Sequence, residues 1–290
     1  MTIRLMISFS QSGGTLLNQC LGSLPRTVVM SEVNPLGGGS GGRARELRTI
    51  KEQAQEWYGI QLSSDDFVAG AVELDDICEA SGRYLIVRDW TQVNFMPYPA
   101  NTGTPPRRLL SLESLREHRD VIAFALVRDV IDVWISKGAP APETFFPFYL
   151  DYAQAILAAG IPIFRYESLV DAPRSFMQSL CATLQIQFSD AFLDYGSFQT
   201  VNGSVQITTR GARQGAIRAL PRRRIARSLA TAVDSSREMR EANRLLGYAT
   251  SYASRDLERL PTMMRRRTED FIDQRVKPRA RRVSALLRGQ

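Results

Sequence analysis

The sequence predicts an α/β protein in which helices flank a central, mostly parallel β-sheet, with a helical C-terminal part. Short apolar runs rich in β-forming residues alternate with stretches of helical periodicity. Polar and charged residues stand where several of these runs end. The chain has 290 residues, 44% of them hydrophobic, which suits one large domain with a single core. Because sheets of this kind bind ligands at the carboxyl ends of their strands, those polar residues are candidates for a site.

The first 21 residues predict a strand, a tight loop and a helix. An apolar run, Ile3–Phe9, stops at Ser10-Gln11-Ser12-Gly13-Gly14, and a helical pattern begins at Thr15. Such a loop points backbone N–H groups at one spot, where the helix N-terminus adds partial positive charge. A phosphate or sulfate is the guest that this arrangement favours. No lysine follows Gly14, which argues against a standard nucleoside-triphosphate loop.

The next stretch predicts a second short strand, a loop and two helices. Thr27–Met30 is typical of a strand, with Glu32 just past its end. The glycine run at residues 37–42 predicts a loop beside the site. A helix is expected over residues 43–58, and Ser63 or Ser64 is expected to cap another that ends near Ala80.

Two later strands end in an Arg-Asp pair. Residues 83–87 precede Arg88 and Asp89, and residues 120–127 precede Arg128 and Asp129. A helix through Ser136 is expected after the second pair, and a proline-rich loop at 97–107 separates the two strands. The remaining expected elements are helices at 143–159, around 176–184, 220–246 and 256–275, and a short strand at 161–166.

Charge is distributed unevenly along the chain, whose net charge is +7. Residues 1–209 hold 16 basic and 22 acidic residues (16 − 22 = −6), whereas residues 210–290 hold 21 and 8 (21 − 8 = +13). Only three basic residues are lysines, and arginine favours bidentate partners such as phosphate and carboxylate. A basic C-terminal third is open to nucleic acid, an acidic membrane surface or an anionic ligand, but a set of solvated helix faces explains it more simply.

The composition excludes several other classes. No apolar run reaches the roughly 20 residues of a membrane span, and the first residues are typical of a core strand rather than a signal peptide. Cys20, Cys78 and Cys181 are scattered and form no metal-type pair. We therefore expect a reduced, cytoplasmic protein with neither a transmembrane segment nor a metal ion.

Together these motifs resemble those of sulfotransferases that use 3′-phosphoadenosine-5′-phosphosulfate (PAPS), across most of the first 215 residues. The opening loop, from Ser12 to Leu17, is similar to the loop that holds the 5′-phosphosulfate. The stretch from Leu126 to Ser136 resembles the 3′-phosphate segment, with arginine at a strand end and serine eight residues later. Residues 165–173 resemble a stretch whose tyrosine lies by the adenine.

The resemblance implies a P-loop-like sulfotransferase architecture with PAPS as sulfuryl donor. Residues 1–215 would form the PAPS-binding core, and residues 216–290 an arginine-rich helical extension packed on or trailing from it. The residues implied to bind the nucleotide are Gln11, Ser12, Gly13, Gly14, Thr15, Leu16, Arg128, Ser136, Tyr166 and Arg210.

The catalytic candidates are Glu32, Arg88 and Asp89. Sulfuryl transfer needs a base for the acceptor's proton and donors for charge on the leaving phosphate. Glu32 matches a glutamate of the family and is the first choice for base, with Asp89 second, although a salt bridge to Arg88 explains Asp89 more simply. The single histidine, His118, is expected at the opposite end of its strand. Arg88 is expected to stabilise developing charge.

Two positions depart from the family pattern. Gln11 stands where many members carry lysine or arginine, so charge on the leaving group must be stabilised by Arg88, Thr15 and the loop amides. Gly14 replaces the usual hydroxyl residue. Either the charge is distributed differently here, or the protein binds the nucleotide and transfers slowly.

Three functions are compatible with these motifs and with the charge distribution. The first is sulfuryl transfer from PAPS to a hydroxyl or amine of a small-molecule or glycan acceptor. The second is a phosphotransferase of related fold, disfavoured by the missing loop lysine. The third is a nucleic-acid-binding protein that uses the basic C-terminal third, whose binding would fall steeply with salt. The order of the motifs favours the first.

Overall fold

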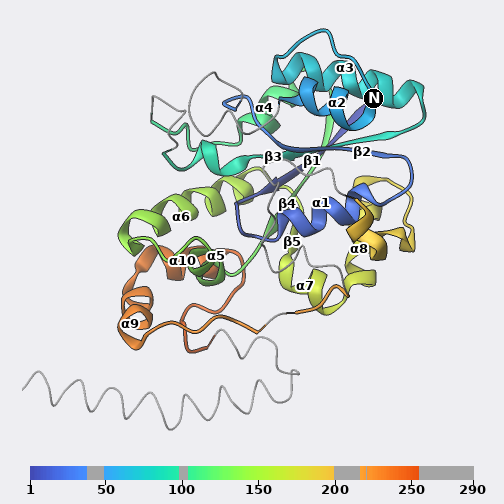
Figure 1. Cartoon of the computed structure of the whole chain (residues 1–290). Helices are drawn as coiled ribbons and strands as arrows, with labels where there is room; N and C mark the ends of the chain where they lie inside the picture. Colours follow the sequence, from blue (N-terminus) through green and yellow to red (C-terminus); the bar gives the residue numbers. More distant parts are fainter. Residues whose placement is uncertain (38–48, 98–103, 199–215, 220, 255–290) are drawn as a thin grey trace, which may run out of the picture.

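The computed structural model describes residues 1–37, 49–97, 104–198, 216–219 and 221–254. Within them, five parallel strands form one sheet in the order β2-β3-β1-β4-β5 (Figure 1). The strands are β1 (Thr2–Ser8), β2 (Thr27–Val33), β3 (Tyr84–Asp89), β4 (Asp120–Val127) and β5 (Ile163–Arg165). The expected α/β class with a parallel sheet is confirmed.

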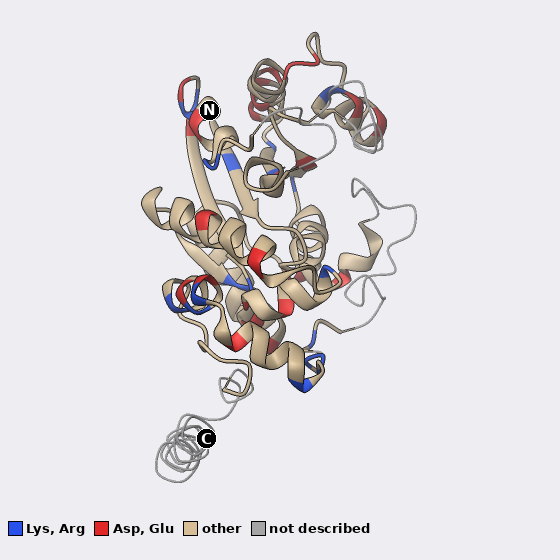
Figure 2. Ribbon diagram, turned by 90° about the vertical axis from the view of Figure 1, so that its left-hand side faces the viewer, with Lys and Arg blue, Asp and Glu red and all other residues tan. Residues whose placement is uncertain are grey.

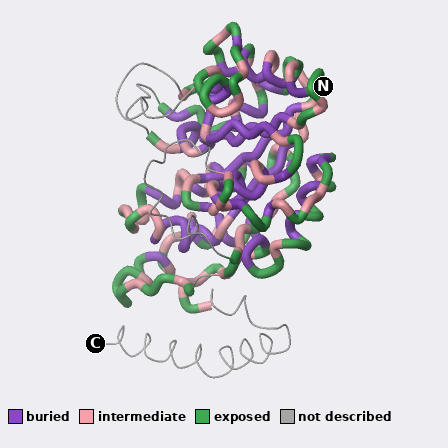
Figure 3. The backbone as a smooth tube through the Cα atoms, turned by 45° about the vertical axis from the view of Figure 1, so that its right-hand side comes forward, coloured by how far each residue is buried: buried purple, intermediate pink, exposed green. Residues whose placement is uncertain are grey.

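Strand β1 lies at the centre of the sheet and is buried on both faces. It pairs with β3 on one side and along its whole length with β4 on the other, from Thr2 opposite Asp120 to Ser8 opposite Leu126. The chain first builds the sheet on one side of β1, with β2 and β3, and then crosses to the other side to add β4 and β5. Ligands of such sheets bind where the strand order reverses, so binding is expected at the carboxyl end of β1. The buried strands form the centre of the molecule, with exposed residues around them (Figure 3).

Helices cover both faces of the sheet and produce two clusters of core residues. Ile3, Leu5 and Ile7 of β1 face α2, α3, α4 and α6, whereas Met6 faces α1 and α8. The first half of the chain contributes α1 (Gly14–Gly22), α2 (Ile50–Tyr58), α3 (Phe67–Ala80), the 3-10 helix η2 (Thr91–Asn94) and α4 (Leu110–Arg116). The second half contributes α5 (Val130–Ser136), α6 (Pro142–Ala158), α7 (Tyr166–Asp171), α8 (Pro173–Leu184), the 3-10 helix η3 (Asp190–Ser197), α9 (Arg227–Ser235) and α10 (Arg237–Leu245).

Several expected boundaries were wrong, each for a local reason. Helix α2 begins at Ile50, where Thr49 and Glu52 form a capping box, and the part of the expected helix over residues 43–48 lies outside the described residues. Asp66, not Ser63 or Ser64, caps α3 by accepting from the N–H groups of Val68 and Ala69.

The end of β2 was also misplaced. β2 continues through Glu32, which has a positive φ of 55° beside an irregularity in the pairing with β3. Arg88 and Asp89 end β3, as expected.

The described C-terminal part contains two short helices instead of the single helix expected over 220–246. Residues 221–226 are not helical, and Ser236 separates α9 from α10 and caps the latter. Helix α10 packs against α6 and α5, beside the core (Figure 1). The helix expected at 256–275 lies outside the described residues. None of the described helices is long and apolar enough to traverse a lipid bilayer.

Candidate functional site

The opening loop joins β1 to α1 through two left-handed backbone positions. Gln11 has a φ of 70° and Gly13 a φ of 90°, and the Ser12 N–H closes the turn on the Phe9 carbonyl oxygen at 3.2 Å. Gly13 is the N-cap residue of α1 and provides no side-chain cap, and the first turn of the helix carries no acidic residue. The free N–H groups and the helix dipole therefore make this end of α1 favourable for an anion.

Serine hydroxyl groups around this loop are buried and lack a hydrogen-bond partner among the described residues. They belong to Ser8, Ser10 and Ser12, and Ser12 is fully buried. Buried polar groups are nearly always paired in folded proteins, with protein atoms, water or ligand. Three unpaired hydroxyl groups beside an uncapped helix are typical of a site that holds a polar ligand.

Arg128 and Tyr166 lie on the opening loop, although the sequence separates them widely from it. Arg128 Nη1 donates to the Gln11 carbonyl oxygen at 3.1 Å across 117 residues. The Arg128 guanidinium also lies over the Tyr166 ring, 4.7 Å from its centroid. A Cβ atom on Gly13 would come within 2.1 Å of Tyr166 Cδ2, so this position requires glycine for space as well as for its φ. The carboxyl ends of β1, β4 and β5 thus bring together Gln11, Arg128 and Tyr166, which the sequence predicted to contact the nucleotide.

The two ends of α5 both approach the opening loop. Arg128 precedes the helix at the Gln11 side, and Lys137 follows Ser136 at the other end. The Lys137 ammonium lies 5.8 Å from the centroid of the Phe9 ring and donates to Gln92 Oε1 at 3.1 Å. Ser136 itself makes no hydrogen bond to the loop in the described residues. Arg210, the remaining predicted phosphate contact, lies outside the described residues.

Arg88 occupies the space that a side chain at position 14 would fill. A Cβ atom on Gly14 would come within 2.9 Å of both Arg88 Nη2 and Ser8 Oγ. This contact explains why glycine stands where the resemblance implies a hydroxyl residue. The contact also brings the buried Arg88 guanidinium, 6% exposed, to the first residue of α1. Arg88 thus supplies positive charge to a loop in which Gln11 supplies none.

The structure pairs Arg88 with Glu32 and leaves Asp89 in a different environment. Arg88 Nη2 donates to Glu32 Oε1 at 2.6 Å, and the Glu32 side chain is 20% exposed. The salt bridge expected between Arg88 and Asp89 was therefore wrong.

Asp89 is fully enclosed by hydrogen-bond donors. It accepts from Asn34 Nδ2 at 2.7 Å, Thr91 Oγ1 at 2.6 Å and Ser111 Oγ at 2.6 Å. Burial raises the pKa of this carboxyl, and the three hydrogen bonds oppose that rise. Its contacts fit a structural role that joins β2, β3 and α4, whereas Glu32 keeps access to solvent.

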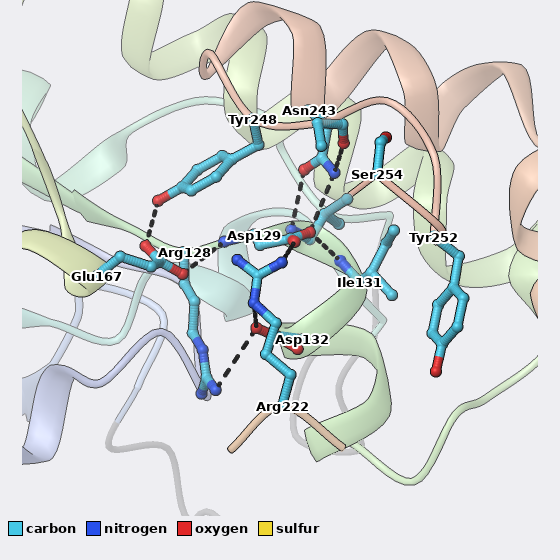
Figure 4. Close-up of polar contacts among 12 residues, drawn as sticks. Arg128, Asp129, Ile131, Asp132, Glu167, Arg222, Asn243, Tyr248, Tyr252 and Ser254 are labelled. Atoms are coloured by element: carbon cyan, nitrogen blue, oxygen red, sulfur yellow. Dashed lines mark hydrogen bonds and ion pairs between the residues drawn. The ribbon is translucent and has the colours of Figure 1, made fainter. Parts of the chain in front are cut away.

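A second polar group, which sequence analysis missed, lies at the start of α5 (Figure 4). Arg222 reaches Asp129 and Asp132 there, while Asn243 donates to Asp129 Oδ1 at 3.0 Å. Burial and the neighbouring Asp132 raise the pKa of Asp129 to about 6, and Arg222 opposes the rise. In the sequence Arg222 stands in a run of three arginines that differ in no visible way, so only the packing singles it out.

Tyr248 and Glu167 continue this group toward the opening loop. Tyr248 donates its hydroxyl to Glu167 Oε2 at 2.7 Å, and Glu167 Oε1 accepts from the Asp129 N–H at 3.4 Å. Burial raises the pKa of Glu167, while the bond from Tyr248 opposes the rise. Glu167 directly follows Tyr166, so the C-terminal part is hydrogen-bonded to the element that packs on Gly13.

Comparison with solved structures shows what this fold resembles. A sulfotransferase domain from the curacin biosynthetic pathway superposes with a TM-score of 0.53 at 15% identity, over 86% of this chain and 98% of that domain. A sulfotransferase domain of the olefin synthase of Synechococcus PCC 7002 gives 0.49 at 17% identity, over 67% of this chain and 77% of that one. A sulfotransferase from Alicyclobacillus acidocaldarius gives 0.36 at 8% identity, over 66% of this chain and 87% of that one.

The comparison with the curacin-pathway domain shows the fold. The five-stranded parallel sheet and its flanking helices resemble those of the curacin-pathway sulfotransferase domain over most of the chain. No protein-family model matches this sequence, and no curated protein sequence matches it.

The described residues contain no group of three or more His, Cys, Asp or Glu side chains arranged to hold a metal ion. The three cysteines are buried and free.

Proposed function

We propose that this protein transfers a sulfuryl group from PAPS to a hydroxyl or amine of a small-molecule or glycan acceptor. The main support is the hydrogen bond between Arg128 and the backbone of Gln11, in a fold that resembles sulfotransferases. It brings the two proposed phosphate-binding elements, from opposite halves of the core, to one edge of the sheet. One nucleotide with phosphates at both ends of its ribose would suit these two elements.

The residues present fit such a nucleotide. The unpaired hydroxyl groups of Ser10 and Ser12 and the uncapped N-terminus of α1 would receive the 5′ end. Arg128 would bind the 3′-phosphate with charge-assisted hydrogen bonds, and Tyr166 would lie near the base. Ser136 and Arg210 remain further predicted contacts. PAPS would supply the sulfuryl group and leave as adenosine 3′,5′-bisphosphate.

The proposed catalytic groups are Glu32 and Arg88. Glu32 has one carboxylate oxygen on Arg88, and its partial exposure leaves it available to take a proton from an acceptor hydroxyl or amine. Arg88, beside Gly14, supplies positive charge where the loop itself has none. Asp89, the second choice for base, is the weaker candidate because its oxygens already accept three hydrogen bonds.

The distribution of charge favours this proposal over nucleic-acid binding. Basic and acidic residues are interspersed over the described helices (Figure 2), and Arg222 is used within the fold. The acceptor, the cytoplasmic location and the boundary between residues 1–215 and 216–290 remain predictions.

Calorimetric titration with adenosine 3′,5′-bisphosphate tests the nucleotide site. We expect binding without magnesium in the wild type and its loss in Arg128→Ala. Arg174→Ala is the matched control, because Arg174 is exposed on α8 and pairs with Asp190 at the surface. Magnesium-dependent ATP binding with no response to the bisphosphate would support the phosphotransferase hypothesis instead.

Glu32→Gln tests the proposed base. The amide keeps the side chain's shape but cannot accept a proton, so nucleotide affinity should persist while turnover collapses. Turnover is measured as release of adenosine 3′,5′-bisphosphate from PAPS with a panel of hydroxyl and amine acceptors. Unchanged turnover would remove Glu32 from this role.

A further inference from the structure

Arg222 returns from the C-terminal part to the start of α5 and lies between two acidic side chains. Its Nη1 is 3.1 Å from Asp129 Oδ2, and its Nε is 3.4 Å from Asp132 Oδ2. All three side chains are at most 6% exposed. Figure 4 shows the guanidinium placed between the two carboxylates. The two acids are one helical turn apart, so a single arginine placed between them can neutralise both.

Asp132 is shared between Arg222 and the proposed phosphate-binding arginine. Arg128 Nη2 lies 4.0 Å from Asp132 Oδ2, the same oxygen that Arg222 Nε approaches. Figure 4 draws both contacts at this one carboxylate. The Arg128 side chain is 24% exposed, whereas Arg222 is enclosed. Arg128 therefore remains accessible to a ligand while Arg222 satisfies the acids behind it.

The positive charge of Arg222 affects how Arg128 can bind an anionic ligand. With Arg222 absent, the two acidic side chains at the start of α5 would lose the cation that lies between them. Asp132 would then attract the Arg128 guanidinium more strongly, and both acids would repel an incoming phosphate. These interactions are screened weakly at buried positions.

Asn243 fixes the geometry of the same group from α10. Its Nδ2 donates to Asp129 Oδ1 and to the Ala249 carbonyl oxygen, while its Oδ1 accepts from the Val130 N–H. Asp129 is thus oriented independently of Arg222. The contribution of Arg222 to this region is accordingly its charge more than its shape.

We propose that Arg222 is a positioning residue of the nucleotide site, which neutralises Asp129 and Asp132 so that Arg128 can direct its charge to the 3′-phosphate. This inference rests on the proposed function, since it needs a ligand with a 3′-phosphate. It assigns part of the arginine-rich C-terminal region to charge compensation inside the fold.

The test compares two nucleotides that differ in the 3′-phosphate. Affinities for adenosine 3′,5′-bisphosphate and adenosine 5′-monophosphate are measured by calorimetry for the wild type and Arg222→Met, which keeps an unbranched side chain. We expect the bisphosphate to bind about tenfold more weakly in the variant, with the monophosphate changed less than about twofold. Arg224→Met, in the same arginine run but exposed, should leave both affinities unchanged.

Two further variants separate charge from structure. Arg222→Met combined with Asp132→Asn should recover most of the lost bisphosphate affinity, because it removes the acid that also contacts Arg128. Asp132→Asn alone should bind the bisphosphate a few-fold more tightly than the wild type, which a damaged fold would not do, and unchanged binding would overturn the positioning role. This single variant also decides the matter if Arg222→Met does not fold.

The outcomes distinguish this inference from the function on which it rests. A wild type that does not bind the bisphosphate overturns both. A wild type that binds it, with equal losses for both nucleotides in Arg222→Met and no recovery in the double variant, leaves the function standing and makes Arg222 merely structural. Weaker bisphosphate binding by Asp132→Asn also overturns the positioning role.

Discussion

The opening loop and the polar group at the start of α5 are both buried and polar, yet they are satisfied to very different extents. At the loop, the hydroxyl groups of Ser8, Ser10 and Ser12 lack partners among the described residues. At the start of α5, Asp129 receives hydrogen bonds from Asn243 and the Ile131 N–H and pairs with Arg222. An unpaired buried polar group is costly, whereas a paired one contributes to a unique fold.

This difference distinguishes a site from a scaffold. The loop retains unused hydrogen-bonding capacity that a ligand can fill, while the buried charges at the start of α5 are paired within the fold, with Asp129 Oδ2 held by its ion pair to Arg222 rather than by a hydrogen bond. Arg128 belongs to both regions, because it contacts Gln11 on one side and Asp132 on the other. The following predictions test whether the two regions respond as differently as their contacts imply.

Asp89→Ala should give the largest loss of stability. Asp89 lies near the loop, but its hydrogen-bonding capacity is used within the fold, as it is at the start of α5. The substitution removes the acceptor of the Thr91 and Ser111 hydroxyl groups and the nearer acceptor of Asn34 Nδ2, which keeps only its longer bond to Ser111 Oγ at 3.3 Å. We expect a loss of about 3 kcal/mol or more in the free energy of unfolding, measured by urea denaturation. Glu32→Gln is the contrasting variant and should change stability much less. An Asp89→Ala protein of wild-type stability would contradict the structural role.

Gly13→Ala tests the loop itself. Alanine is strained at a φ of 90°, and its Cβ would overlap the Tyr166 ring. We expect a loss of roughly 2–3 kcal/mol together with loss of nucleotide binding, followed by denaturation and calorimetry. Gly59→Ala is the matched control, because Gly59 has a φ of 67° and open space around it. It should cost about 1 kcal/mol and leave binding intact. Equal effects of the two variants would mean that the Tyr166 contact is unimportant.

The pH dependence of stability tests the α5 group. The Asp129 pKa is raised from 3.8 to about 6, so the folded state holds this proton more tightly than the unfolded state. The resulting stabilisation is fully present below pH 3.8 and is lost as pH rises through about 6. We expect the wild type to lose roughly 3 kcal/mol relative to Asp129→Asn over this interval. A difference that does not vary with pH would contradict the raised pKa.

Tyr248→Phe should have the smallest effect. It removes the hydroxyl that donates to Glu167 Oε2 but keeps the packed ring. We expect a loss of about 1 kcal/mol. Because the hydrogen bond from Tyr248 lowers the pKa of Glu167, its removal should raise that pKa further, which can be followed by NMR. A Glu167 pKa that stays unchanged would show that this bond does not hold the carboxylate.

Local sequence patterns predicted some elements well and misjudged others. The expected strand at 120–127 coincides with β4, because a continuous apolar run with turn residues at both ends leaves little alternative. The helix expected over 220–246 became α9 and α10, because Ser236 provides an N-cap that outweighs continued helical periodicity. Glu32 lies within β2 rather than after it, because the pairing of β2 with β3 tolerates an irregularity that no local pattern reveals.

Local sequence was sufficient to predict the α/β class with its parallel sheet, the strand, loop and helix at the start of the chain, and the arginine at the end of β4, because each is signalled by neighbouring residues. Packing alone determined which side chains meet. It chose Glu32 rather than Asp89 as the partner of Arg88, and it selected Arg222 from a run of similar arginines. These choices join residues far apart in the chain, and they depend on the space and charge that the folded strands and helices leave between them.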